Sequence, residues 1–339
     1  MLALLRGVSR SFYVSIRLLP APLRRPIAVA YLLARATDTL ADTAELPSSE
    51  RRDKLDTLAA AIDGRLGGRD GIASLVASFA PLQSDAAERD LIVALPCCLS
   101  WLEELERADR DDVRQVLRHI TRGQALDIER FAPGGAAQAL ASAEQLDEYT
   151  YLVAGSVGEF WTDLCFRHLP DFAALPRREM RELGRAYGMG LQLVNILRDA
   201  GADLAAGRCY FPSDELAAAG LRPQDILREA HRFEGVWTHW HARAQSRLEQ
   251  GMRYADAVAS RRVRAASALP ALVGTRTLAL LRLAGPQRLH GSKVKVPRRE
   301  VRAMMARLAF TLAGRAPLQA LFGRLHGRGP YRGWDNPTP

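Results

Sequence analysis

The chain has 339 residues, of which 48% are hydrophobic and 25% charged, and its formal net charge is +9. This composition is ordinary for a globular protein, and the length suffices for one large or two ordinary domains. The apolar runs argue against a membrane-spanning protein. Arg35 and Arg315 interrupt two of these runs before they reach the roughly 18 residues that cross a bilayer. The initial "MLALLRGVSRSF" is too short an apolar stretch for a signal peptide, so we expect a cytoplasmic protein, soluble or on a membrane surface.

Arginine dominates the basic residues. Only Lys54, Lys293 and Lys295 are lysines, so 44 of the 47 basic residues are arginines. This excess favours anionic partners such as phosphates, lipid head groups or nucleic acid, although a compositional preference for arginine explains it equally well. Cysteine is sparse and shows no C-x-x-C pair, so we expect buried free thiols in a reducing compartment.

Apolar residues recur at helical spacing along nearly the whole chain, and alternating strand-like runs are nearly absent. The clearest helical stretches are residues 91–108, 113–131, 226–259 and 301–325. Glycine and proline clusters separate such stretches and predict roughly a dozen helices joined by short connections. We therefore predict an all-α fold with a single domain over residues 1–325 and a flexible tail over residues 326–339.

Two aspartate pairs have the spacing that places side chains on one helix face. Asp38 and Asp42 follow the apolar run "IAVAYLLA", and Asp199 and Asp203 follow "YGMGLQLVNIL". Residues four apart on a helix have Cβ atoms about 5–6 Å apart. Because both pairs extend apolar runs, we expect them to face inwards, where unpaired carboxylates are costly. Two such pairs can face one another across a bundle and bind a divalent cation.

The same spacing also arises by chance. With 38 acidic residues in 339, roughly four such pairs are expected. An exposed like-charge pair costs only ~0.2–0.5 kcal/mol, so a solvated helix surface tolerates it. The apolar neighbourhood of the two pairs favours a metal site over this alternative.

Oxygen ligands without nearby histidine or cysteine suit Mg²⁺, which commonly bridges carboxylates to a substrate phosphate. Asn195 adds a neutral oxygen one turn before Asp199. Arg35 and Arg198 can bind phosphate oxygens through forked hydrogen bonds. The residues therefore predict the handling of a diphosphate.

Four segments stand out along the chain: "SRSF" (9–12), "YLLARATDTLAD" (31–42), "DEYTYLVAGSVGEF" (147–160) and "LQLVNILRDAGADLAAGRCYFP" (191–212). In order and spacing, they resemble the motifs of the squalene and phytoene synthase family. The segment "DTLAD" is more similar to squalene synthases, and "GRCYFPSDELAAAGL" is more similar to phytoene synthases. As a whole, the chain most resembles a bacterial squalene synthase.

The resemblance implies an all-α isoprenoid synthase fold, a helical bundle around a central cavity, with Mg²⁺ between two aspartate-rich helices. It implies a farnesyl-diphosphate farnesyltransferase that joins two farnesyl diphosphates head to head into presqualene diphosphate and reduces this to squalene with NADPH. The alternatives are a phytoene or dehydrosqualene synthase, without the reduction or with a longer prenyl substrate, and an enzyme that stops at presqualene diphosphate.

The resemblance also implies roles for single residues. The implied metal ligands are Asp38, Asp42, Asp199, Asp203 and Asn195. The implied catalytic residues are Tyr149, Arg35, Arg198 and Asn195, with Tyr149 as a hydrogen-bonding relay. The implied substrate-binding residues are Ser9, Arg10, Phe12, Tyr31, Arg35, Gln192, Asn195, Lys293 and Lys295, the two lysines by a loose match. Val153 joins them as an apolar candidate for the cavity wall, for which a plain core role is equally expected.

The chain departs from the family pattern at three positions. Ala41 and Ala202 stand where relatives often carry an acid, and Gly201 costs ~1 kcal/mol of helix propensity relative to alanine. These departures leave the number of resting Mg²⁺ ions open. No glycine-rich dinucleotide fingerprint is present, so NADPH, if used, binds in another way.

A different explanation is a basic helical protein that binds nucleic acid or anionic membranes without chemistry. It accounts for the net charge but not for two acidic motifs, which repel phosphate unless a metal intervenes. We therefore expect prenyl diphosphate substrates and no nucleic acid, and we leave peripheral attachment to anionic membrane open. The sequence does not determine the oligomeric state.

Overall fold

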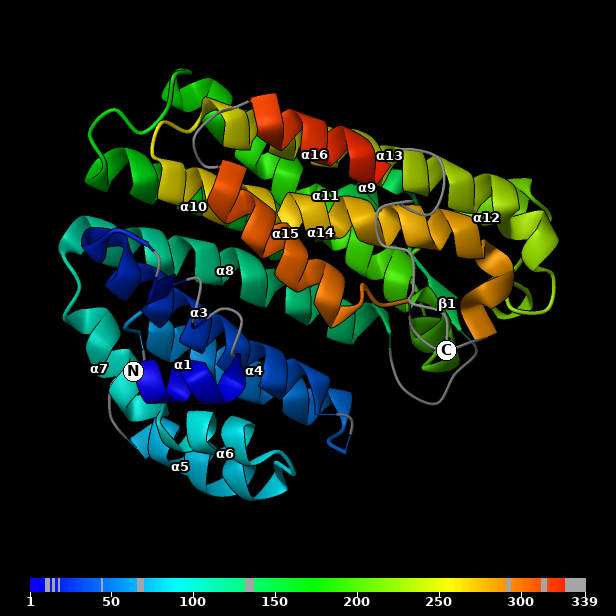
Figure 1. The fold of residues 1–339 in the computed structure, drawn as a ribbon. Helices are drawn as coiled ribbons and strands as arrows, with labels where there is room; N and C mark the ends of the chain where they lie inside the picture. The colour runs from blue at the N-terminus through cyan, green and yellow to red at the C-terminus, as the bar shows by residue number, and fades with distance from the viewer. Residues whose placement is uncertain are drawn as a thin grey trace, which may run out of the picture. The chain divides into compact units, whose positions relative to one another are not determined.

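The computed structural model describes residues 1–326 except 10–12, 14–15, 18, 44, 66–69, 132–136, 291–293 and 312–315. Helices dominate the described chain (Figure 1), which confirms the predicted all-α fold. The chain groups into two compact units, unit 1 with Met1–Gly134 and Leu152–Pro170, and unit 2 with Gly135–Tyr151 and Asp171–Pro339. The single domain over residues 1–325 stays a prediction, and nearly all of the predicted tail lies outside the described residues.

Unit 1 contains the first aspartate pair, at the end of helix α3 (Ala21–Asp42). This helix packs along α8 (Arg107–Arg130) and contacts α4 (Ser48–Ile62). It begins after Pro20, and a second proline lies in its first turn, where a missing N–H breaks no helical hydrogen bond. The remaining elements are α1 (Leu2–Val8), α5 (Asp70–Phe79), η1 (Ala80–Leu82), α6 (Ala86–Val93), α7 (Leu95–Glu103) and α10 (Ser156–His168).

Unit 2 contains the second aspartate pair, on α11 (Arg177–Ala205). This helix packs along α13 (Ala230–Ala257), and α14 (Arg261–Ala284) packs against both. Gly190 permits the approach of α11 and α13, because a Cβ there would lie 2.7 Å from Arg247 Cβ and 3.2 Å from its carbonyl carbon. The remaining elements are α9 (Ala143–Thr150), α12 (Ser213–Ala218), η3 (Pro223–Asp225), η4 (Pro286–His290), α15 (Arg298–Thr311) and α16 (Ala316–His326).

Two short strands accompany the helices of unit 2. The strands β1 (Gln138–Ala139) and β2 (Arg208–Cys209) pair in parallel, with Gln138 opposite Arg208. Gly207 adopts a left-handed backbone with φ of +82°, which lets the chain leave α11 and enter β2. The prediction that strands are nearly absent is therefore confirmed, and this pair positions the end of the second motif.

The helix boundaries differ from several predicted ranges. The range 301–325, predicted as one helix, comprises α15 and α16. Residues 91–108 do not form one helix, because α6 ends at Val93 and α7 begins at Leu95 with Pro96 in its first turn. Proline cannot donate the N–H that a continuous helix would need there. The helix predicted over residues 226–259 begins at Ala230, after a turn. A π-helical turn, η2 (Tyr151–Gly155), joins α9 to α10 at the point where the chain passes between the units.

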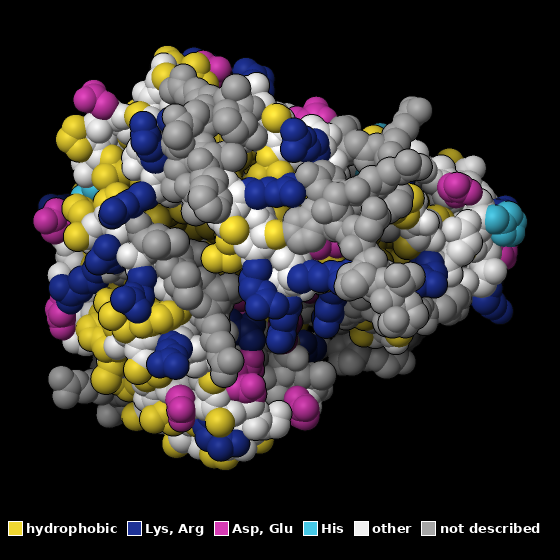
Figure 2. Space-filling model, in the orientation of Figure 1, with side chains coloured by type: hydrophobic (Ala, Val, Ile, Leu, Met, Phe, Trp, Pro, Cys, Tyr) yellow, Lys and Arg dark blue, Asp and Glu magenta, His cyan; other side chains and the backbone are white. Residues whose placement is uncertain are grey.

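No helix within the described residues is long and apolar enough to cross a membrane. Lys and Arg side chains recur across the face drawn in Figure 2, as the arginine-rich composition predicts. A surface of this kind raises the local concentration of anionic groups.

The close approach at Gly190 predicts that Gly190→Ala destabilises the protein by ~1–3 kcal/mol, because the added methyl group overlaps Arg247 and its backbone. Gly235→Ala on α13 is the matched control, since no atom lies within 4 Å of the added Cβ. Alanine there should stabilise the helix by up to ~1 kcal/mol. Thermal unfolding followed by circular dichroism measures both variants, and equal effects would show that α11 and α13 do not meet at Gly190.

Candidate active site

The first aspartate pair lies on one face of α3. Four predicted residues share this face at spacings of three or four: Tyr31, Arg35, Asp38 and Asp42. Tyr31, Arg35 and Asp38 are half-buried and Asp42 is exposed, whereas the opposite face of α3 is buried. The hydroxyl groups of Thr37 and Thr39 donate to backbone carbonyls of the same helix, at 2.8 Å and 3.0 Å. These threonines therefore do not compensate the carboxylates beside them.

Asp38 has an amide partner rather than a basic one. Gln124 Nε2, on α8, donates to Asp38 Oδ1 at 2.5 Å. Arg35 pairs instead with Glu88 of α6. Among the described residues no basic side chain forms an ion pair with Asp38 or Asp42. Burial, followed by the nearby charge of Asp42, raises the pKa of Asp38 to about 6. Among the described residues of unit 1, the first pair therefore carries negative charge without an ion-pair partner.

Packing explains the absence of an acid at Ala41. This residue is buried with Leu55, Ala125 and Ile128 in an apolar cluster. A carboxylate at this position would lose its hydration without gaining a partner, which is strongly unfavourable. The departure from the family pattern therefore belongs to the buried side of α3 and leaves the outward face intact.

The second aspartate pair has arginine partners within unit 2. Arg198 Nη2 donates to Asp199 Oδ2 at 2.6 Å. Arg208 Nη2, on β2, donates to Asp203 Oδ1 at 2.8 Å. Charge-assisted hydrogen bonds of this length compensate both carboxylates. The two pairs thus have the same spacing but different electrostatic surroundings.

The predicted amides lie on the same face of α11 as the second pair. Asn195 Nδ2 donates to Gln192 Oε1 at 3.3 Å. The face consists of half-buried side chains that recur every three or four residues: Gln192, Asn195, Asp199 and Asp203. The structure therefore brings these four predicted residues together as a polar stripe on one helix.

Three residues at these sites were not predicted from the sequence: Gln124, Arg208 and Tyr210. The ring of Tyr210 stacks on that of Tyr149, with centroids 5.0 Å apart and planes at 25°. The two phenol oxygens lie 3.5 Å apart, and both side chains are buried. Arg208 and Tyr210 belong to the quoted segment "GRCYFP", but the β1–β2 pairing that positions them is a tertiary contact. No local signal singled out Gln124.

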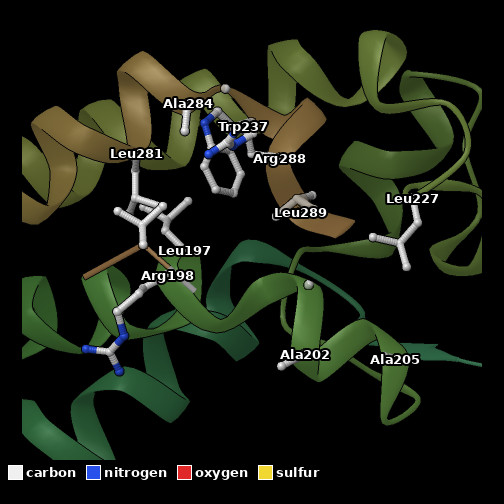
Figure 3. Close-up of a pocket in the computed structure, with 13 residues that line it drawn as sticks. Leu197, Arg198, Ala202, Ala205, Leu227, Trp237, Leu281, Ala284, Arg288 and Leu289 are labelled. Atoms are coloured by element: carbon white, nitrogen blue, oxygen red, sulfur yellow. The ribbon is translucent and has the colours of Figure 1, made fainter. Parts of the chain in front are cut away.

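A cavity of about 290 Å³ lies beside α11 within unit 2 (Figure 3). Trp237, Leu281 and Leu289 supply much of its apolar lining. Arg198 also lines the cavity, but its guanidinium turns away from these side chains in Figure 3 and binds Asp199. Neither aspartate of the second pair lines the cavity. It is therefore separate from the polar stripe of α11.

Gly201 allows η4 to touch α11 at the wall of this cavity. A Cβ on Gly201 would lie 1.9 Å from the carbonyl oxygen of Leu289. Any side chain would displace the η4 backbone. Glycine lowers the helix propensity of α11 here, but it permits this contact with η4. Ala202 also lines the cavity, so the second missing acid belongs to this apolar side of the helix.

The other predicted residues have varied surroundings. Ser9 lies just after α1, where its N–H donates to Leu5 O at 2.9 Å. Val153, in η2, packs against α8, because a Cβ on Gly123 would lie 2.6 Å from Val153 Cγ1. Lys295 is exposed. Arg10, Phe12 and Lys293 lie outside the described residues.

The donor set of the first pair fits a divalent cation. The Asp38 carboxylate binds the Gln124 side chain, whose Oε1 is buried and has no hydrogen-bond partner among the described residues, and Asp42 lies near enough to Asp38 to raise its pKa. Oxygen donors of this kind suit Mg²⁺. Among the described residues no three Asp, Glu, His or Cys side chains form a ready metal-binding group, and the two pairs belong to different units. The metal roles of Asp38, Asp42, Asp199, Asp203 and Asn195 therefore stay predictions.

Residues 5–300 match the model of the squalene/phytoene synthase family, which is most of the chain. The chain belongs to the squalene/phytoene synthase family. It is 31% identical over 237 residues to a bifunctional lycopene cyclase/phytoene synthase of Colletotrichum graminicola, covering 67% of this chain and 36% of that protein. It is 28% identical over 243 residues to a squalene synthase of Cyberlindnera jadinii, covering 69% of this chain and 50% of that protein. A phytoene synthase of Arthrospira platensis is 27% identical, with 67% of each chain covered. The match thus spans only about a third of the bifunctional relatives.

Solved structures share the fold of this squalene/phytoene synthase family member. The complex of TcSQS with the ligand E5700 superposes with a TM-score of 0.71 at 20% identity, covering 96% of both chains. A dehydrosqualene synthase with a bound ligand superposes with a TM-score of 0.60 at 20% identity, covering 92% of this chain and 95% of that one. The predicted isoprenoid synthase fold is therefore confirmed.

The raised pKa of Asp38 predicts a pH-dependent effect of Asp38→Asn on stability. The folded-state pKa of about 6 exceeds the ordinary value of 3.8, so the folded state binds this proton more tightly, and ionisation destabilises it as the pH rises through this window. Without metal, Asp38→Asn should be more stable than wild type by up to ~3 kcal/mol near pH 8 and by about half that near pH 5.

Urea denaturation in the presence of EDTA at the two pH values measures this difference. Asp53→Asn, which changes an exposed aspartate of α4 in the same unit, is the control and should have little effect at either pH. A difference for Asp38→Asn that is independent of pH would show that the Asp38 carboxylate is not raised in pKa.

Proposed function

We propose that this protein catalyses the Mg²⁺-dependent head-to-head condensation of two prenyl diphosphates. The observation that carries the proposal is the Asp38–Asp42 pair, two carboxylates on one helix face with no ion-pair partner among the described residues. Such a pair attracts a divalent cation, and Mg²⁺ held by carboxylates commonly binds substrate phosphates. Membership of the squalene/phytoene synthase family supports prenyl diphosphates as those substrates.

The aspartates are proposed to act by holding the cation. Asp38 and Asp42 on α3, and Asp199 and Asp203 on α11 with Asn195 beside them, supply oxygen ligands. Mg²⁺, when bound, neutralises the negative charge that develops on a departing diphosphate. Each pair is proposed to keep a cation beside its own helix.

The arginines of the site are proposed to exchange partners when substrate binds. Arg198 and Arg208 now bind Asp199 and Asp203, and Arg35 binds Glu88. A cation that takes the carboxylate oxygens weakens the first two ion pairs. The released guanidinium groups can then bind a diphosphate through two parallel hydrogen bonds each. This exchange keeps the carboxylates and the guanidinium groups of the second pair partnered before and after binding.

The stacked tyrosines are proposed to form a hydrogen-bonding relay. A phenol with an ordinary pKa near 10 is a poor base by itself. Tyr149 and Tyr210 lie with their oxygens 3.5 Å apart, so a proton accepted by one can be passed along the pair. Their burial keeps water away from a reactive allylic cation. The oxygen of a departing diphosphate would be the final acceptor.

We propose farnesyl diphosphate as the substrate and squalene as the product, with presqualene diphosphate as intermediate and NADPH as reductant. The similarity to a squalene synthase at 28% identity supports this choice. The substrate-binding residues proposed from the motifs are Ser9, Arg10, Phe12, Tyr31, Val153, Gln192, Lys293 and Lys295. The basic composition supports peripheral contact with anionic membrane as a further proposal, and the free cysteines support a cytoplasmic location as another.

A second candidate is a phytoene or dehydrosqualene synthase, which needs no NADPH. Its support is the similarity to phytoene synthases and to bifunctional phytoene synthases at 27% to 31% identity. Product analysis of the purified protein with farnesyl diphosphate, with and without NADPH, separates the candidates. Squalene formed only with NADPH supports the first. Dehydrosqualene, or phytoene from geranylgeranyl diphosphate, supports the second, and accumulated presqualene diphosphate indicates an enzyme that stops there. Absence of Mg²⁺-dependent diphosphate release would refute the condensation itself.

Asp199→Asn should lower turnover by about 10²–10³-fold, because the asparagine cannot neutralise or orient a cation as the carboxylate does. The helical circular dichroism should stay unchanged, since the side chain is half-buried and its shape is retained. Asp90→Asn, at an exposed position of α6, is the control and should keep wild-type turnover. Mg²⁺-dependent diphosphate release measures both, and near-normal release by Asp199→Asn would remove this aspartate from the metal site.

A further inference from the structure

Gln124 is a buried polar residue that touches the first aspartate pair. Its side chain extends from α8, and the residue is only 8% exposed. Its Nε2 donates to Asp38 Oδ1 at 2.5 Å, across the contact between α8 and α3. All of these groups belong to unit 1, so this contact is internal to one compact body.

The other half of the same amide has no partner. Gln124 Oε1 is buried and accepts no hydrogen bond in the described structure. Leaving a buried acceptor unsatisfied costs ~1–3 kcal/mol, and nearly all buried polar atoms in folded proteins are paired. Because the nitrogen of the same amide binds Asp38, the oxygen lies near the Asp38 carboxylate. A donor that reaches it there would satisfy it.

The surroundings of Gln124 make a purely structural role a poor explanation. Ala125 follows it directly and packs with Ala41, Leu55 and Ile128 in the apolar cluster. A methionine or leucine at position 124 would fill similar space without an unsatisfied oxygen. The backbone here is also held closely, because a Cβ on Gly123 would lie 3.1 Å from Leu152 Cβ. Gln124 is thus a polar side chain in a closely packed part of unit 1, and it contacts the Asp38 carboxylate.

We propose that Gln124 is a positioning residue of the Asp38–Asp42 cation site, in which its N–H holds the Asp38 carboxylate and its oxygen accepts from the hydration shell of the cation. This inference rests on the proposed Mg²⁺ function of the pair. A glutamine suits the role because it orients Asp38 without neutralising it, whereas an arginine would compete with the cation and a glutamate would add repulsion. Partners that orient a ligating carboxylate commonly change metal affinity when removed.

The test measures cation binding without turnover. Metal-free wild type, Gln124→Met and Asp38→Asn are titrated with MgCl₂ at a fixed concentration of inorganic diphosphate, and the rise in melting temperature gives the Mg²⁺ midpoint. Gln124→Met should raise this midpoint about 10-fold or more. Its melting temperature without Mg²⁺ combines two opposed effects, loss of the unsatisfied oxygen and loss of the hydrogen bond to Asp38, so the Mg²⁺ midpoint is the deciding measurement. Gln124→Leu provides the same measurement if Gln124→Met does not fold.

The control is Thr121→Val, one turn earlier on α8, where a buried hydroxyl donates to Leu117 O and does not bind Asp38. It should leave the Mg²⁺ midpoint unchanged. A lower melting temperature of Gln124→Met without a change in midpoint would assign Gln124 a structural role and overturn the inference. If Asp38→Asn loses the Mg²⁺ response and Gln124→Met keeps it, the inference fails and the metal site stands. If wild type shows no Mg²⁺-dependent rise in melting temperature, or if Asp38→Asn shows the same rise as wild type, both the proposed metal function and this inference fail.

Discussion

A carboxylate inside a helical protein needs a partner, and the two aspartate pairs of this protein meet that need differently. Asp199 and Asp203 bind arginines that the same stretch of chain supplies, so their charge is compensated within unit 2. Within the described part of the chain, Asp38 binds the amide of Gln124 and no basic side chain, and burial together with the nearby charge of Asp42 raises its pKa to about 6. The first pair is therefore the one whose negative charge most strongly favours a cation.

The two pairs differ in what the proposed cation binding requires of them. At the second pair, a cation and a diphosphate would replace the arginine contacts. At the first pair, no ion pair has to break, because Arg35 is already bound to Glu88. Cation binding at Asp38 and Asp42 then relieves repulsion directly. One pair can thus favour the cation while the other releases the groups that bind the phosphate.

Close helix contacts at glycines fix the faces on which these groups lie. Gly123 brings α8 against Val153, Gly190 brings α11 against α13, and Gly201 receives the backbone of η4. Each contact orients one face of a helix towards its neighbours, so the opposite face carries the functional side chains. The polar stripe of α11 lies on the side of the helix away from its contacts at Gly190 and Gly201. Ala41 lies on the packed face of α3, which explains why an acid is missing there.

The sequence by itself determined the all-α fold, the family and the polar faces of α3 and α11, because helical periodicity and motif spacing are local properties of the chain. It could not supply Gln124, Arg208 or Tyr210. Each of these meets its partner through a contact between separate elements, such as α8 with α3 or β1 with β2. It also missed that Arg35 binds Glu88, which lies 53 residues further along the chain. The sequence determines which side chains are present. Which charged and polar groups pair with one another depends on distances and burial, and only the tertiary structure decided these.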